Sequence, residues 1–220
     1  MQIQKILVKY DLPNAHQILQ DPPSKSSWRV AVMQHVNKYW TQRLTHCAEQ
    51  YISLKFMDGT SYKPGRIHPL LHDVTDNRAV ARYAVKIKMV TGTYILQSNR
   101  ASFNNSEIDP NCLLCAEEPE TLAHFILKCE KLEATRANIM CSIEQCVYSY
   151  TGLKLCDLSD EEVLQLILDV GKLESSHFRQ LLKPNIRSDI EHHTRRLCYA
   201  LHTRHYYLIS MLPTRKRDGL

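Results

Sequence analysis

Cys112-Leu-Leu-Cys115 is followed by eight residues, then by His124, four more residues and Cys129, which gives the pattern C-x2-C-x8-H-x4-C. Three thiols and one imidazole are the ligands that closed, tetrahedral structural zinc sites use. The tight spacing of the first two cysteines places both sulfurs on one side of a turn. We therefore expect these four residues to bind one structural zinc ion, around which the rest of the chain is organised.

The residues around the pattern indicate how its ligands are presented. Thr121 can cap a short helix from Leu122 to Lys128, which would carry the histidine near its start and lead into the last cysteine. Pro110 and Pro119 restrict the loop on either side of the paired cysteines. The sequence thus predicts a small zinc knuckle made of a turn and a short helix.

The same four side chains could instead be buried reduced thiols beside a core histidine, or could include a disulfide. The chain has 8 cysteines in 220 residues, so chance alone gives about 0.3 C-x2-C pairs, and far fewer with a suitable histidine and cysteine downstream. The start, Met1 to Tyr10, is too short and too charged for a signal peptide. We expect an intracellular protein of the cytoplasm or nucleus, where reducing conditions favour a metal or free thiols over a disulfide.

Several segments around the pattern resemble a known family. They are Lys88 to Gln97, Asn99-Arg100, the paired cysteines, and Glu120 to Cys129. Together they resemble the zinc-binding C-terminal tail of non-LTR (LINE-type) retrotransposon reverse transcriptases, over about residues 78 to 136. In that family the tail follows the polymerase palm and helps the enzyme to hold template RNA or target DNA. The resemblance implies that RNA or DNA is the partner of this chain, which would then be such a tail without its polymerase.

Composition indicates an ordinary, mainly helical protein. Hydrophobic residues make up 44% of the chain and charged residues 23%, with only 6 glycines. No apolar run approaches the ~20 residues that span a bilayer, so we expect no membrane partner. The expected fold is mainly α, with a small zinc knuckle and little or no sheet. We divide it into an N-terminal helical flank (1–75), a basic helix with the knuckle (76–135) and a C-terminal helical region with a basic tail (136–220).

Charge is distributed unevenly along the chain. Residues 105–175, which include the knuckle, carry 5 Lys and Arg against 14 Asp and Glu, a balance of −9. Residues 61–104 carry 7 Lys and Arg against 2 Asp and Glu, a balance of +5. Residues 176–220 carry 9 Lys and Arg against 3 Asp and Glu, a balance of +6. If the protein binds nucleic acid, its basic flanks should attract the phosphates while the knuckle fixes their geometry.

A basic amphipathic helix is predicted over residues 77–90. Its expected inner face consists of Val80, Tyr83, Ala84, Ile87 and Val90. Basic residues recur every four positions on another face, and Arg100 follows in a segment, 92–111, that we expect to be a polar loop. We expect nucleic-acid contacts from Arg78, Arg82, Lys86, Lys88 and Arg100. The simpler alternative is that these cations form a solvated helix face.

Further helices are predicted from their apolar periodicity, and local signals mark where some of them begin or end: an N-cap among Ser24 to Ser27, Gly152 as a helix end, and a capping box at Ser159 and Glu162. A long one begins at Trp28, and its face includes Val32, Val36, Tyr39, Trp40, Cys47 and Tyr51; a hydrophobic core explains this face better than a base-stacking platform. Another spans residues 131–150, and the last, basic one spans residues 187–212. Cys141, Cys146 and Cys156 have no matching histidine or fourth thiol nearby, so we expect no second metal site.

Catalytic motifs are missing from the chain. It contains no phosphate-binding glycine loop, no nucleophile elbow, and no aspartates placed as in a polymerase palm or a nuclease. We therefore expect a non-catalytic, zinc-stabilised nucleic-acid-binding module. The alternative is a structural or protein-interaction helical domain without a nucleic-acid role. A metallohydrolase is less favoured, because four soft ligands close the zinc site to water.

Overall fold

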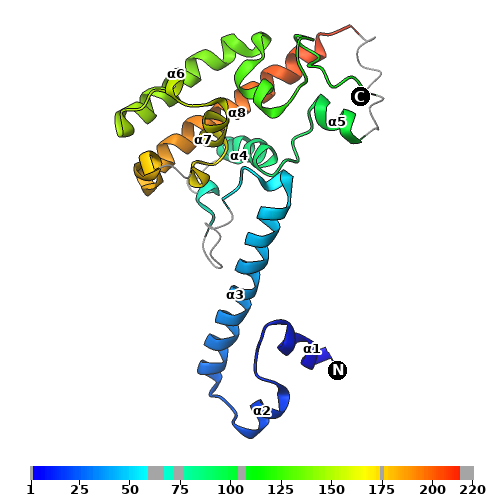
Figure 1. The fold of residues 1–220 in the computed structure, drawn as a ribbon, viewed down its shortest axis with the longest axis vertical. Helices are drawn as coiled ribbons and strands as arrows, with labels where there is room; N and C mark the ends of the chain where they lie inside the picture. Colours follow the sequence, from blue (N-terminus) through cyan, green and yellow to red (C-terminus); the bar gives the residue numbers. More distant parts are fainter. Residues whose placement is uncertain (1, 59–66, 72–76, 104–107, 174–175, 214–220) are drawn as a thin grey trace. The chain divides into compact units, whose positions relative to one another are not determined.

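The structure is a computed structural model, and it describes residues 2–58, 67–71, 77–103, 108–173 and 176–213 (Figure 1). Helices predominate in these residues, and their only extended pairing is an isolated antiparallel bridge between Asn111 and Pro119. This confirms the expectation of a mainly α protein with little or no sheet. The chain forms two compact units: Met1–Tyr51 with Gly59–His68, and Ile52–Asp58 with Pro69–Leu220.

In the residues that the structure describes, the first unit contains three helices, two of which begin at polar caps. The side chain of Asn14 accepts a hydrogen bond from the main chain of Gln17, and that of Ser24 accepts one from Ser27, as the serine-rich segment before Trp28 predicts. The helices are α1 (Gln2–Lys9), α2 (Ala15–Gln20) and α3 (Lys25–Gln50).

The apolar face of α3 does not form a buried core. None of the α3 side chains that the structure describes is buried, and Trp40 is 38% exposed. Tyr39 instead makes edge contacts with the rings of Tyr10 and Trp40, at 5.2 and 5.4 Å between centroids, and the Lys9 ammonium lies 5.0–5.3 Å from all three rings. The prediction of a core along this helix is wrong for the described residues, because α1 and α2 leave its apolar face partly exposed.

The second unit is a cluster of helices around the long C-terminal helix α8. That helix packs most extensively against α6 and α4 and also contacts α7 (Figure 1). The helices are α4 (Asn77–Val90), α5 (Gln97–Phe103), α6 (Glu133–Thr151), α7 (Asp160–Leu168) and α8 (Pro184–Ser210). Short turns connect them: η1 (Ile52–Leu54), η3 (Pro69–Leu71), η4 (His124–Lys128), η5 (Glu130–Leu132), η6 (Leu155–Asp157), η7 (Val170–Lys172) and η8 (Ser176–Leu182).

Local sequence signals set several of these helix ends. Gly152 ends α6 in the left-handed conformation, at φ +72°, where glycine carries no steric penalty. Ser159 and Glu162 form a reciprocal capping box at the start of α7, as their spacing predicts. Pro184 occupies the first turn of α8, where its missing N–H costs nothing.

One hydrophobic core joins the parts of the second unit. Met89 of α4, Phe125 of the knuckle, Ile143 of α6 and Leu201 of α8 all belong to it. The division that we placed between residues 135 and 136 is therefore not a boundary between compact units. Within the described ranges, no helix combines the length and the apolar character needed to cross a bilayer.

Candidate metal centre and basic surface

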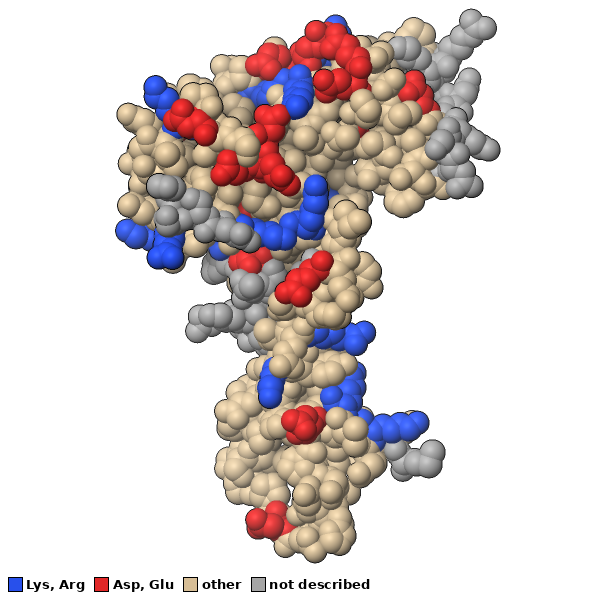
Figure 2. All heavy atoms as spheres, viewed as in Figure 1, with Lys and Arg blue, Asp and Glu red and all other residues tan. Residues whose placement is uncertain are grey.

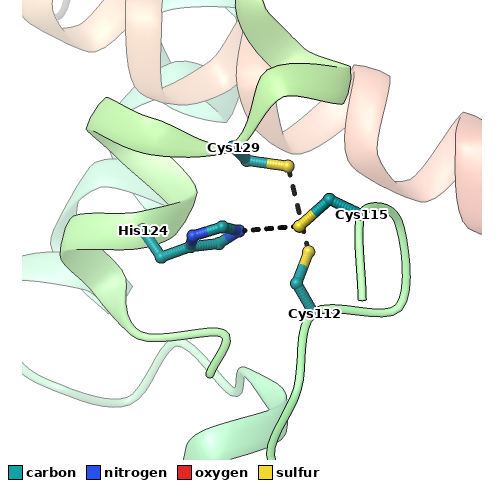
Figure 3. Close-up of side chains that lie close together, drawn as sticks. All are labelled: Cys112, Cys115, His124 and Cys129. Carbon is teal, nitrogen blue, oxygen red and sulfur yellow. Dashed lines mark hydrogen bonds between the residues drawn. The ribbon is translucent and has the colours of Figure 1, made fainter. Parts of the chain in front are cut away.

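The structure brings all four predicted metal ligands together (Figure 3). Their donor atoms lie within 4.8 Å of one another; Cys112 and Cys129 are 3.8 Å apart at Sγ, and Cys115 Sγ is 3.3 Å from His124 Nε2. A disulfide is excluded for the first pair, since its sulfurs would be only about 2.05 Å apart. Cys115 is partly exposed and the other three side chains are buried. This cluster can hold a metal ion.

The first two sulfurs come from a hairpin-like turn. The bridge between Asn111 and Pro119 closes its base, and the main chain of Cys112 donates a hydrogen bond to the carbonyl of Glu118 at 2.9 Å. Ala116 has φ +62°, a left-handed conformation that is uncommon for alanine and lets the chain reverse directly after the second cysteine. The turn thereby holds both thiols on the side that faces the histidine.

The other two ligands come from a widened helical turn, η4. His124 N donates a hydrogen bond to Thr121 Oγ1 at 3.1 Å, so the predicted cap is confirmed. The turn itself is a π-turn rather than the ordinary helix, and the Cys129 N–H bonds to the His124 carbonyl at 2.8 Å. Residues five apart lie about 140° apart around an α-helix. The wider π-turn brings the two ligands to one side, a geometry that often occurs at functional sites.

Two supporting side chains were missed by the sequence analysis. Glu118 Oε2 lies 3.3 Å from His124 Nδ1, which leaves Nε2 directed at Cys115. Ligating histidines commonly have such a carboxylate partner, which fixes the ring orientation. Buried Arg136 donates to the carbonyls of Ile126 and Cys129, at 3.3 and 2.8 Å. Its position on the apolar face of the predicted 131–150 helix was a signal that could have revealed it.

Glu120 connects the metal cluster to the surrounding helices. Its carboxylate is buried and lies 2.6 Å from Nε2 of His205 on α8. It also accepts the main-chain N–H of Gln97 at the start of α5, at 2.9 Å, and lies 3.8 Å from the sulfur of Cys112. The knuckle, α5 and α8 therefore meet at one buried carboxylate.

The sulfurs of Cys112 and Cys129 lie within hydrogen-bonding distance of each other, at 3.8 Å. A hydrogen bond to Cys129, and then burial, raises the pKa of the Cys112 thiol. The pKa of Cys129 is lowered, chiefly because its sulfur accepts that hydrogen bond. Thiolates are the metal-binding form, so a cation that binds here must displace the thiol protons.

The predicted orientation of α4 is wrong. Its buried side chains are Val85, Lys86, Met89 and Val90, whereas Val80 and Ala84 of the predicted inner face are exposed. The helix is thus rotated by roughly 130° about its axis relative to the prediction, at ~100° per residue. The cause is Lys86, which is only 1% exposed because its ammonium pairs with Glu191 of α8 at 2.6 Å. Lys86 therefore cannot contact a nucleic-acid phosphate.

The other predicted cations have different surroundings. Arg78 and Lys88 are exposed, and in the described part of the chain no carboxylate pairs with either. Arg82 and Arg100 are half-buried. The segment expected to be a loop contains α5, and Arg100 lies on that helix. The five residues therefore do not form one continuous exposed face.

A second set of cations lies on the outer face of α8. Arg196 and Arg204 are exposed two helical turns apart, and His202 is close enough to Lys88 of α4 for that positive charge to help lower its pKa, after burial and His205. We call Lys88, Arg196 and Arg204 the basic surface. Acidic side chains gather instead over the upper part of the second unit in Figure 2, in keeping with the negative balance of residues 105–175.

The chain matches no protein-family model, and no curated protein or solved structure is similar enough to count as a relative. Its function is therefore inferred from the side chains themselves.

Proposed function

We propose that the Cys112, Cys115, His124 and Cys129 cluster binds one structural zinc ion. With Zn–S bonds of about 2.3 Å, a tetrahedral site separates two sulfurs by about 3.8 Å and a sulfur from a nitrogen by about 3.6 Å. The observed separations are 3.8 Å between Cys112 and Cys129 and 3.3 Å between Cys115 and His124. Four protein ligands leave no open position for a reactive water, which favours a structural role over a hydrolytic one.

The function that these features support best is non-catalytic binding of RNA or DNA. The observation that carries it is the charge of the C-terminal sequence: residues 192–217 contain six Lys and Arg, four His and no Asp or Glu, and of these cations Arg195 is buried while Arg196 and Arg204 are exposed. Polyanions are attracted by such an unbroken positive segment. The resemblance to the tail of non-LTR retrotransposon reverse transcriptases supports the same partner.

In this proposal the metal centre positions the basic surface rather than contacting phosphate. Phe125 of the knuckle packs edge-on against the His205 ring, at 5.2 Å between centroids, and the Glu120 carboxylate holds the same ring. Metal binding would thereby fix the C-terminal half of α8, which also carries the exposed Arg204. The acidic character of residues 105–175 makes direct phosphate contact by the knuckle unfavourable.

The test is RNA binding measured against salt concentration. Each lost phosphate contact lowers the slope of log K against log salt by about 0.7 for a single strand. Replacing Lys88, Arg196 and Arg204 together by Ala should therefore lower the slope by about 2 and weaken binding, while the thermal melt and the metal content stay unchanged. The control removes Lys128 and Lys154, exposed lysines of the acidic segment, and should leave the slope as in the parent. Equal slopes for the parent and the triple variant would contradict the proposal.

A protein-interaction domain is the second candidate function. The observation in its favour is the first unit, where large apolar side chains are more than 45% exposed: Ile3, Ile6, Val8, Leu19, Val30 and Met33. Exposed apolar residues at this density are typical of surfaces that contact another protein. Protein interaction becomes the better-supported function if the chain binds neither RNA nor DNA at low salt.

A further inference from the structure

Two exposed tyrosines lie near a cation on the outer face of α8. Tyr206 and Tyr207 are 57% and 50% exposed, although both are large and mostly apolar side chains. The guanidinium of Arg204 lies 5.3 Å from the centre of the Tyr207 ring. The ring of His202 contacts that of Tyr206 at 4.7 Å between centroids. Both tyrosine rings are therefore accessible from solvent, and the ring of Tyr207 lies beside the positive charge of Arg204.

Buried side chains beneath His202 support the Tyr206 part of this face. The Tyr94 hydroxyl and His202 Nδ1 are 3.0 Å apart, and Tyr94 is itself buried. Tyr94 packs against Phe125 of the knuckle at 5.5 Å between centroids, and Phe125 follows the metal ligand His124 directly in sequence. A continuous row of contacts thus connects the metal cluster to the exposed Tyr206. Preorganised rings lose little entropy when a ligand stacks on them.

The chemistry of this face selects one class of ligand. Exposed cations attract a polyanion, and exposed rings favour a partner that offers flat π-faces. A nucleic-acid duplex offers the charge but keeps its bases stacked inside. A single strand offers both, because its bases are free to stack on aromatic side chains.

We propose that the outer face of α8 binds single-stranded nucleic acid, with bases stacked on Tyr206 and Tyr207 and phosphates paired with Arg204 and Lys88. This rests on the proposed nucleic-acid-binding function and adds to it a preference for unpaired bases. RNA and DNA strands share the π-faces and the phosphates, so the face itself does not choose between them.

The experiment measures fluorescence anisotropy of the full chain with four labelled probes of about 16 nucleotides, a length that such sites can occupy. The probes are oligo-U RNA, oligo-T DNA, an abasic strand of the same length, and a duplex. The parent should bind either or both base-containing single strands at least tenfold more tightly than the abasic strand and the duplex. Replacing Tyr206 and Tyr207 by Ala should remove this preference, and replacing both by Phe should keep it.

Two controls make the outcome specific. Replacing Tyr148, which is similarly exposed on α6, by Ala should leave all four affinities unchanged. The thermal melt of the alanine variant should match that of the parent, since both rings lie mostly in solvent. If the parent binds all four probes equally and the alanine variant behaves in the same way, base stacking is refuted while nucleic-acid binding stands. If the parent binds no probe, both proposals fail.

Discussion

The ammonium of Lys86 on α4 lies 2.6 Å from Oε2 of Glu191 on α8, and both side chains are almost fully buried. Thr194 accepts a second hydrogen bond from the same ammonium at 2.7 Å. Burial raises the pKa of Glu191, and the charge of Lys86 and its hydrogen bond oppose that shift. The pair fixes the rotation of α4 against α8, because each charge needs the other.

Replacing Lys86 by Met should lower the free energy of unfolding by about 3–5 kcal/mol, because the Glu191 carboxylate is left buried without a counter-charge. Replacing Lys86 by Met and Glu191 by Leu together should recover much of that loss. Urea denaturation measures the free energy of unfolding of both variants. Lys88→Met, on the exposed side of the same helix, is the matched control and should be about as stable as the parent. A Lys86→Met variant as stable as the parent would show that the pair does not hold α4.

Arg136 is expected to support the metal centre through the main chain. Replacing it by Met leaves the carbonyls of Ile126 and Cys129 without their donor, which should cost about 1–3 kcal/mol of stability. Metal affinity should fall by about 10- to 100-fold, as it does when supporting groups around other metal sites are removed. A competition titration with a chelator measures the affinity. Arg179→Met, at an exposed arginine of η8, should change neither quantity.

His202 should make stability depend on pH. Burial, and then the charges of His205 and Lys88, lowers its pKa below the ordinary value, and its ring faces Tyr94 and Tyr206. The folded protein therefore binds this proton less readily than the unfolded chain does. The contribution of the neutral His202 ring to stability is complete above the pKa of histidine in the unfolded chain, about 6.5. This contribution is lost as the pH falls below that value towards the pKa of His202 in the folded protein.

The measurement is the difference in thermal melting temperature between the parent and His202→Gln, taken from about pH 7.5 to about pH 5. The parent should lose more stability on acidification than the variant, which cannot titrate at this position. His193, whose pKa is also lowered, is present in both proteins and cancels in the difference. Parallel melting curves at every pH would contradict the assignment to His202.

Local signals in the sequence identified much of the fold and of the candidate site. Caps at Ser24 and Ser159, the left-handed Gly152 and the four metal ligands depend on short spacings, so one segment of sequence is sufficient to recognise them. The π-turn of η4 was not predicted, since the hydrogen bond that defines it leaves no mark in the sequence.

The wrong predictions about α3 and α4 have a common physical cause. Whether a side chain is buried depends on a partner that is distant in the sequence. A lysine at position 86 appears solvated unless Glu191, 105 residues later, is known to face it. In the same way, the apolar face of α3 resembles a core face until it is known that the other helices described in its unit, α1 and α2, leave that face partly exposed. Periodicity locates a helix and its faces, but not which face meets which neighbour.

The central claim is that Cys112, Cys115, His124 and Cys129 hold one zinc ion, and native mass spectrometry of protein purified without chelator tests it most directly. We expect one zinc ion per chain in the parent, none in Cys129→Ser, and one in Cys141→Ser, which changes an exposed cysteine outside the cluster. A metal-free parent, or a Cys129→Ser variant that keeps its zinc, would contradict the claim.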